Sequence, residues 1–576
     1  MLLLVVVYLG SAFSPALLDD ADATHAEAAR EMVVRGDYVT LHVNGVRYLE
    51  KAPLLYWAVA LCYRVFGINE FATRLPTLLA VLLTAVLAMK WGQRAFGEPA
   101  SIYAGLMIAT TTGYYLFTRI LIPEAILALL IASAMYFLFT ALEERQAWRW
   151  YAGYACVGLA ILAKGLVAPV FVAAPAVIYL GLTGDWRRWR EFRLVTGALV
   201  VLLIAAPWHL LAGFRNQGFF WFYFVNEHFL RFLGKRYPKD YNKLPALLYW
   251  ALHLVWLFPW SMYLPLAVRD ARRKQAENES PPLAARTRLL CWIWAGVILV
   301  FFAISTNQEY YTLPAYFPLI MLVASALARN EEAEQGRGWL LGGTAVLVAL
   351  SLAAGLTLLA GLWSSRHIPY VADISTVLAK HDLATDTLSM SHMLDLTGET
   401  LAALRLPAVL AVIALLIGPA LALWLRLRRR DFAATWTLAC TLALFFIAAH
   451  IALNRFEPYL SSKKLAQVIE RLARPEDKLM IYGDQAFGSS LLFYTGRPIY
   501  LVEGRSSSMW FGSTFPDAPK IYLHNSELAQ EWKSGTRIFL FVPPHQKARV
   551  EALRLEPMYS IVESSGKTVY SNRPGS

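Results

Sequence analysis

EAILALLIASAMYFLFTAL, residues 124–142, is an apolar run with a single charge, Glu124, at its first position. A transmembrane helix needs about 20 mainly apolar residues, because each residue advances it about 1.5 Å through ~30 Å of hydrocarbon. Comparable runs recur along the chain, which is 57% hydrophobic and 16% charged. Soluble domains are about 45–50% apolar and ~25% charged. The sequence therefore predicts an integral membrane protein.

Thirteen apolar segments are interpreted as membrane crossings. They lie near residues 2–18, 72–88, 100–117, 124–142, 150–162, 167–182, 194–212, 247–268, 289–304, 312–328, 340–362, 406–425 and 433–451. The first has no basic n-region and no small-residue cleavage motif, so we expect a membrane helix rather than a cleaved signal. The stretch 54–67 is shorter and contains Arg64, and we expect it to lie in the membrane interface.

Basic residues concentrate in every second loop, which makes those loops cytoplasmic by the positive-inside rule. The net charge of +12 does not indicate nucleic-acid binding, because the Lys and Arg residues lie in short loops between apolar runs. Four single cysteines without paired spacing predict neither a disulfide frame nor a cysteine metal site.

The chain changes character after Ile451, where long apolar runs give way to short β-rich pieces and polar helical pieces. We expect residues 1–453 to form an all-α membrane domain of about 13 transmembrane helices, with outer loops at 19–71, 214–246 and 363–405. Residues 454–576 are predicted to form a soluble α/β domain on the outer side, because thirteen crossings is an odd number.

Ionisable residues gather in the loops assigned to the outer face. These are Asp20, Asp22, Glu50, Lys51, Glu124, Glu227, His228, Arg231, Arg236 and Glu309. An interfacial charge costs little, so each residue taken singly also fits a helix cap, a helix-dipole partner or a snorkelling side chain. Their convergence on one face indicates a functional site.

The run from Ala26 to Trp57, which contains NGVRYLEKAPLLYW, closely resembles the first periplasmic loop of bacterial GT-C glycosyltransferases. That superfamily includes the aminoarabinose transferases that modify lipid A and relatives of the protein mannosyltransferases. The later segments NEHFLRF and FPWSMYLPLA resemble the segments that follow in the same order. The resemblance covers the membrane region and implies a polyprenyl-phosphate-linked sugar as donor.

On this resemblance Lys51 and Arg236 bind the lipid phosphate, while Tyr48 and Tyr311 line the same cavity. Glu50 and Arg231 are further expected donor-site residues, and Arg231, Lys235 and Lys239 compete with Arg236 for the phosphate role. A Lys or Arg at this position would stabilise the negative charge that grows on the leaving phosphate as the glycosidic bond breaks.

Relatives carry an Asp-Glu pair where this chain has Ala21 and Asp22. The nearest carboxylates, Asp20 and Asp22, are therefore both candidates for the main catalytic carboxylate, as general base for a protein acceptor or as a positioning group for lipid A, and Glu124 matches a second acidic position. A protein Ser or Thr acceptor needs a general base, whereas a lipid A phosphate is already ionised near neutral pH.

No HExxH spacing is present, so zinc catalysis is not indicated. Glu50, Glu227 and His228 are weak candidates for a zinc or magnesium ion, but a hydrogen-bonded structural histidine is the favoured interpretation. No cofactor is expected to be required, because the donor lacks the pyrophosphate that usually calls for a divalent ion.

We therefore expect an inverting transferase that moves a sugar, by resemblance 4-amino-4-deoxy-L-arabinose, from undecaprenyl phosphate to lipid A. The enzyme would act as a monomer in the bacterial inner membrane, with its site facing the periplasm. One alternative is transfer of a hexose to protein Ser or Thr or to another envelope acceptor. A transporter or flippase for polyprenyl lipids is the alternative from another class. The sequence alone leaves the sugar, the acceptor and the role of the C-terminal domain open.

Overall fold

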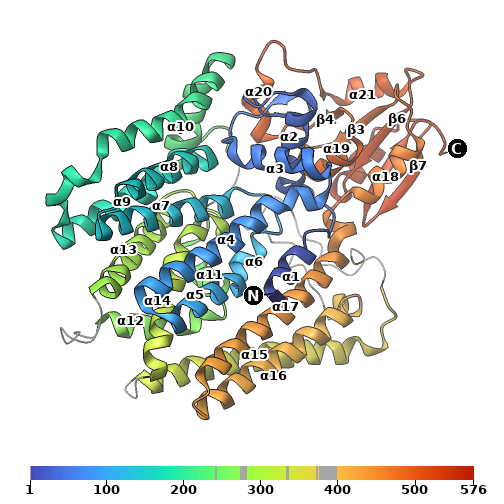
Figure 1. Ribbon diagram of the computed structural model, residues 1–576. Coiled ribbons are helices and arrows are strands. Elements are labelled where there is room, and N and C mark those ends of the chain that lie inside the picture. Colours follow the sequence, from blue (N-terminus) through green and yellow to red (C-terminus); the bar gives the residue numbers. More distant parts are fainter. Residues whose placement is uncertain are drawn as a thin grey trace.

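The computed structural model describes residues 2–239, 243–272, 282–332, 336–371, 374 and 398–575. Most of the expected outer loop at 363–405 lies outside the described residues. A body of long helices carries a smaller sheet region at one end, and α2 and α3 lie between the two (Figure 1). The all-α membrane fold with a C-terminal α/β region is therefore confirmed.

Among the described residues, fifteen α-helices make up the membrane body. They are α1 (Leu2–Gly10), α4 (Glu70–Phe96), α5 (Glu98–Thr110), α6 (Thr112–Leu116), α7 (Glu124–Glu144), α8 (Ala147–Lys164), α9 (Val167–Thr183), α10 (Leu194–Arg215), α11 (Ala246–Trp256), α12 (Leu264–Arg272), α13 (Pro282–Ile304), α14 (Leu313–Glu332), α15 (Arg337–Ser364), α16 (Arg405–Leu427) and α17 (Asp431–Leu460).

Helices occupy each of the thirteen expected positions. Within the described residues, eight are long and apolar enough to cross a membrane, and a bent pair brings the number to nine. The bend of 99° separates α11 from α12, because Pro259 lacks the N–H that would continue the expected span 247–268. The expected first span is also interrupted, since α1 ends at Gly10. The total number of crossings remains a prediction.

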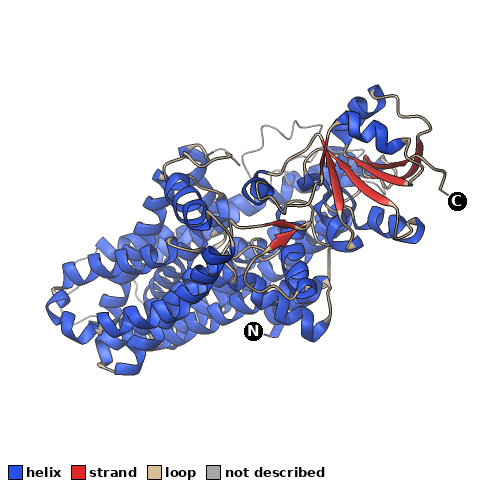
Figure 2. Cartoon of the chain, turned by 90° about the horizontal axis from the view of Figure 1, so that it is seen from above, coloured by secondary structure: helices blue, strands red, loops and turns tan. Residues whose placement is uncertain are grey.

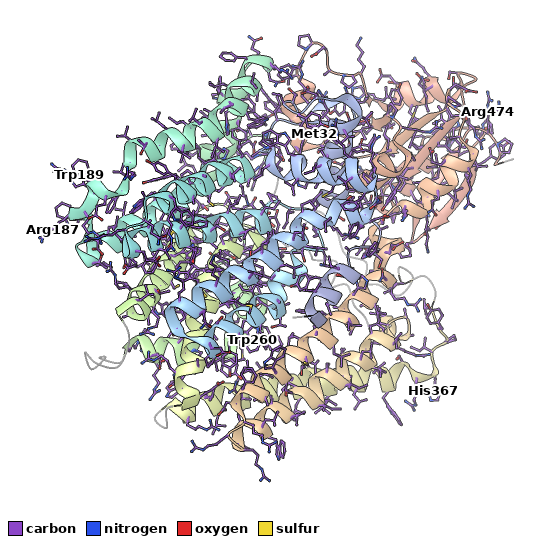
Figure 3. All side chains as sticks on the ribbon, viewed as in Figure 1. Met32, Arg187, Trp189, Trp260, His367 and Arg474 are labelled. Carbon is purple, nitrogen blue, oxygen red and sulfur yellow. The ribbon has the colours of Figure 1, made fainter. Side chains whose placement is uncertain are left out.

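The helix ends divide the membrane body into two faces. A short turn joins α7 to α8, so Glu124 and Lys164 lie at one face, while Glu144 and Arg149 form an ion pair of 2.7 Å at the other. About 30 Å separates the faces, from 21 residues at about 1.5 Å each. Figure 3 shows Arg187, between α9 and α10, far from Arg474 of the sheet region.

The first loop folds into α2 (Ala21–Arg35), a hairpin of β1 (His42–Val43) and β2 (Val46–Arg47), and α3 (Leu54–Phe66). Asn44 and Gly45 turn the hairpin with φ of 53° and 76°, as the Asn-Gly pair of a type I′ turn requires. The helix α3 packs against α2 and α4, and at 13 residues it is shorter than a membrane span.

The C-terminal region contains a six-stranded sheet in the order β5-β4-β3-β6-β8-β7. Its strands are β3 (Lys478–Tyr482), β4 (Ile499–Val502), β5 (Tyr522–Leu523), β6 (Ile538–Val542), β7 (Tyr559–Ser564) and β8 (Lys567–Ser571). The first four strands in that order run parallel and β8 and β7 run antiparallel to their neighbours. Its helices are α18 (Lys463–Leu472), α19 (Ser489–Thr495), α20 (Trp510–Ser513), α21 (Asn525–Trp532) and α22 (Lys547–Ala552). The expected domain boundary at 453 falls inside α17, which continues to Leu460.

Polar contacts tie this sheet region to the first loop. Asp19 accepts hydrogen bonds from Ser490 and forms an ion pair of 2.8 Å with Lys567. Asn44 exchanges two hydrogen bonds, of 2.7 and 2.9 Å, with the backbone of Ile499 on β4. The sheet region therefore packs against the same face of the molecule as the first loop (Figure 2).

Candidate functional site

A cavity of about 370 Å³ opens at the face where α7 begins and α8 ends. Most of the expected site residues line it: Glu50, Lys51, Glu124, Glu227, His228, Arg231 and Tyr311. They come from the first loop, from α7, from the π-helix η2 (Trp221–Leu230) and the residue after it, and from the 3-10 turn η4 (Glu309–Thr312). The fold thus brings together residues that are distant in sequence.

Glu50 connects the first loop to the segment that follows η2. Its carboxylate lies 2.8 Å from Lys51 Nζ and 2.7 Å from Arg236 Nη2. Burial disfavours the ionised carboxylate, but the charges of Lys51 and Arg236 outweigh it and lower the pKa of Glu50 to about 2. Glu50 is therefore ionised at neutral pH.

Glu227 connects Arg236 to Arg231. Arg236 Nε lies 2.9 Å from both oxygens of Glu227, and Arg231 Nη2 lies 2.7 Å from Glu227 Oε2. Arg231 also donates a hydrogen bond of 3.4 Å to the Tyr311 hydroxyl. The π-helix places Glu227 and Arg231 on one face of the segment, and such helices occur frequently at functional sites.

Lys164, at the end of α8, forms an ion pair with Glu124 at the start of α7. Its ammonium also lies 3.9 Å from the centre of the Tyr311 ring, a cation–π contact. Sequence reasoning did not select Lys164. Its only signal was a lysine in the tight turn after an apolar span, at the same face as Glu124.

Aromatic and aliphatic side chains form the rest of the cavity wall, among them Val170, Phe229, Phe232 and Phe301. Phe229 and Val170 are exposed, and in a membrane-spanning body such apolar positions face lipid. The rings of Phe232 and Phe301 are 5.0 Å apart. The cavity therefore combines a charged interior with apolar walls.

Arg236 and Tyr48 do not line this cavity. Arg236 lines a neighbouring cavity of about 400 Å³, which shares Arg231 with the first and also contains Lys239 and Lys243. Tyr48 is buried and donates a hydrogen bond of 3.2 Å to Glu50. The expectation that Tyr48 lines the donor cavity is therefore wrong, and Tyr48 instead supports Glu50 from behind.

The two aspartates of the first loop occupy different environments. Asp22 is buried, accepts N–H hydrogen bonds from Leu18 and Leu121, of 3.0 and 2.8 Å, and lies 3.7 Å from Arg74. Neither Asp22 nor Asp20 lines the cavity. The contacts of Asp22 are those of a structural anchor, which does not support a general-base role.

Asp20 reaches the protein surface at the start of α2. Desolvation by the surrounding protein and the negative charges of Asp484 and Asp19 raise the pKa of Asp20 to about 6, against the opposing effect of Lys51. Asp20 therefore lies within electrostatic reach of Lys51 and titrates close to neutral pH.

His228, a weak metal candidate in the sequence, and His25 both have hydrogen-bond partners in the protein. His228 Nδ1 lies 2.6 Å from the Tyr223 carbonyl and Nε2 lies 3.4 Å from the Lys164 carbonyl. His25, which lines the cavity, lies 2.6 Å from the Tyr56 hydroxyl, and burial lowers its pKa to about 3. The part of the chain that the structure describes holds no group of three His, Cys, Asp or Glu side chains suited to a metal.

The chain is similar in sequence to several known proteins. The dolichyl-phosphate-mannose-protein mannosyltransferase family model matches residues 50–210. An undecaprenyl phosphate-α-4-amino-4-deoxy-L-arabinose arabinosyl transferase of Pseudomonas paraeruginosa is 32% identical over 58% of this chain and 60% of its own length. One from Aeromonas salmonicida is 26% identical over 89% of this chain and 87% of its own. The chain thus spans about 60% of the length of the Pseudomonas relative it matches.

The solved structures extend the likeness to nearly the whole chain. The crystal structure of ArnT from Cupriavidus metallidurans bound to undecaprenyl phosphate matches with a TM-score of 0.77 and 26% identity, covering 99% of this chain and 96% of that one. The resemblance noted in the sequence is therefore confirmed. The chain is a multi-span membrane protein whose fold is similar to that of ArnT and whose sequence is similar to those of aminoarabinose transferases.

Proposed function

We propose that the protein transfers 4-amino-4-deoxy-L-arabinose from undecaprenyl phosphate to a phosphate of lipid A, at the periplasmic face of the inner membrane. The observation that carries the proposal is the charge distribution at the cavity. Three carboxylates, Glu50, Glu124 and Glu227, line the cavity together with three cations, Lys51, Lys164 and Arg231. Arg236, from the neighbouring cavity, pairs with Glu50 and Glu227.

These cationic side chains adjoin apolar walls that suit a polyprenyl chain. A glycosylated polyprenyl phosphate joins a negatively charged phosphodiester to a long apolar chain, which matches this combination. The names of the arabinosyl transferase relatives and the undecaprenyl phosphate bound to ArnT support this class of donor.

In the proposed reaction an oxygen of the acceptor attacks the anomeric carbon from the side opposite the phosphate. The bond from that carbon to the phosphate oxygen breaks, its electron pair stays on the phosphate, and the anomeric configuration inverts. Lys51 and Arg231 stabilise the second negative charge that develops on the departing phosphate. An ionised phosphate acceptor needs no base, so Asp20 and Glu124 would orient the acceptor and the sugar.

The test uses the full chain in proteoliposomes with glycosylated undecaprenyl phosphate and lipid A. Mass spectrometry should detect the aminoarabinose added to lipid A and the release of free undecaprenyl phosphate. Lys51→Ala should lower the rate by about 10²–10³-fold, as loss of a transition-state charge partner does. Lys547→Ala, which removes a surface pair with Glu563 in the sheet region, should leave the rate unchanged.

The outcomes distinguish the alternatives. A flippase would move the donor without releasing undecaprenyl phosphate, and a protein glycosyltransferase would release it only with a Ser- or Thr-bearing acceptor. Full activity of Lys51→Ala would contradict the assignment of the phosphate site.

A further inference from the structure

Two buried polar atoms face the cavity without a hydrogen-bond partner among the described residues. They are Glu124 Oε2 and the Tyr223 hydroxyl. Both residues line the cavity, and each is 1% exposed. An unsatisfied buried polar group costs about 1–3 kcal/mol, so two such groups in one cavity call for a ligand or a further partner.

These two atoms belong to one cluster. Lys164 binds the other oxygen of Glu124, and the next residue, Gly165, approaches Tyr223 so closely that a Cβ there would lie 2.9 Å from the hydroxyl. The Tyr56 hydroxyl belongs to the same cluster, because burial and the negative charges of Glu50 and Glu124 raise its pKa. An unpaired acceptor and an unpaired hydroxyl thus adjoin the cationic residues.

The chemistry of the cluster excludes two of the three parts of a lipid-linked sugar. The polyprenyl chain has no polar group to offer it, and the phosphate would be repelled by the Glu124 carboxylate. A sugar ring carries hydroxyl or ammonium donors beside oxygen acceptors, which complement a carboxylate oxygen and a phenol. Lys164 and Tyr311 connect the cluster to Arg231, so the sugar would lie next to its phosphate.

We propose that Glu124 Oε2 and the Tyr223 hydroxyl form the glycosyl-binding subsite of the cavity. Glu124 accepts a hydrogen bond from an ammonium or hydroxyl of the sugar, and Tyr223 donates one to a sugar oxygen. This assignment rests on the proposed function, because the sugar arrives on the polyprenyl phosphate.

Tyr223→Phe is the decisive variant, because it removes one oxygen that has no partner among the described residues. Binding is measured in detergent for undecaprenyl phosphate and for its aminoarabinosyl derivative. We expect about five- to tenfold weaker binding of the glycosylated lipid, as one lost hydrogen bond implies, and an unchanged affinity for the bare lipid. The melting temperature should stay equal or rise, because the variant no longer buries an unpaired hydroxyl.

Tyr114→Phe is the matched control. Tyr114 is equally buried and its hydroxyl also has no partner among the described residues, but it does not line the cavity. This variant should bind both lipids like the parent protein. Glu124→Gln should weaken binding of the aminoarabinosyl lipid while leaving binding of the bare lipid intact.

The subsite assignment is overturned if Tyr223→Phe binds the glycosylated lipid as tightly as the parent protein, or if it loses affinity equally for both lipids. Binding of the two lipids by the parent protein tests the proposed function itself. If the parent protein binds neither lipid, the donor class is wrong, whatever the variants do.

Discussion

Arg236 joins the two halves of the charged network, and its removal should destabilise the fold more than any exposed arginine would. Its guanidinium contacts Glu50 at 2.7 Å and both oxygens of Glu227 at 2.9 Å. The side chain is only 4% exposed. Arg236→Ala would leave two buried carboxylates that each keep one cation, Lys51 for Glu50 and Arg231 for Glu227.

The expected size follows from that geometry. Removing one partner of a buried ion pair costs about 3–5 kcal/mol, and the retained cations place Arg236→Ala near the lower end, at about 3 kcal/mol. The pKa of Glu50 is lowered, so Glu50 stabilises the fold above its ordinary pKa and loses this effect as the pH falls through the lowered value. Without Arg236 the pKa of Glu50 rises, and the carboxyl protonates more readily.

A protonated Glu50 needs no cation, so the cost of Arg236→Ala should shrink as the pH is lowered from neutral toward the ordinary glutamate pKa. Free energies of unfolding in detergent micelles at several pH values measure this. The control is Arg215→Ala, which removes a pair of 3.2 Å with Asp37 from a side chain that is 54% exposed, and should cost less than about 1 kcal/mol. Equal costs for both variants, or a cost that does not change with pH, would refute the reasoning.

Three further predictions concern the first loop and the sheet region. Asp484→Asn removes a negative charge that raises the pKa of Asp20, so the acid side of the pH profile of the transfer rate should move to lower pH, whereas Asp484→Glu should leave the profile in place. An unchanged profile in the asparagine variant would contradict a role for Asp20. Asp22→Asn should lower the free energy of unfolding by about 3 kcal/mol, because it leaves Arg74 buried without its counter-ion. Asp20→Asn should instead lower the transfer rate without that loss of stability, and the reverse pattern would restore Asp22 as the catalytic candidate. Phe511→Ala should lower kcat about tenfold, because Phe511 stacks at 4.3 Å on Phe222 of η2 and helps to hold Glu227 and Arg231 in place. Phe511→Leu should recover part of the rate, and hydrogen exchange in Phe511→Ala should rise in η2 but not in α7.

The membrane helices could be predicted because the physics that places them is local. An apolar run of sufficient length has no stable alternative to a helix in hydrocarbon, so the run at 124–142 appears as α7 within two residues of its expected end. The bend at Pro259 was missed because the flanking residues are as apolar as those of a continuous span. Its direction depends on how α12 packs against α14 and α15.

The charged residues of the site could be predicted individually but not as pairs. Glu50 and Lys51 are adjacent in a distinctive run. Lys164 is identified as a site residue only by its contact with Glu124, which lies 40 residues earlier in the chain. Asp20 and Asp22 are two residues apart at a helix start, and no sequence pattern separates them. The backbone N–H of Leu121, which binds Asp22, lies 99 residues away.

The neighbouring carboxylate of Glu50 explains how the Lys51 ammonium remains ionised in the wall of the cavity. Burial would lower the pKa of the Lys51 ammonium, and Arg231 would lower it further, but Glu50 more than offsets both and raises it. Glu227 fixes the positions of Arg231 and Arg236, because its carboxylate forms ion pairs with both. If the cations bind the donor phosphate as proposed, the glutamates need no role in proton transfer to support activity. By holding Lys51, Arg231 and Arg236 in place before the donor binds, they would allow a phosphate to be stabilised without rearrangement of the site.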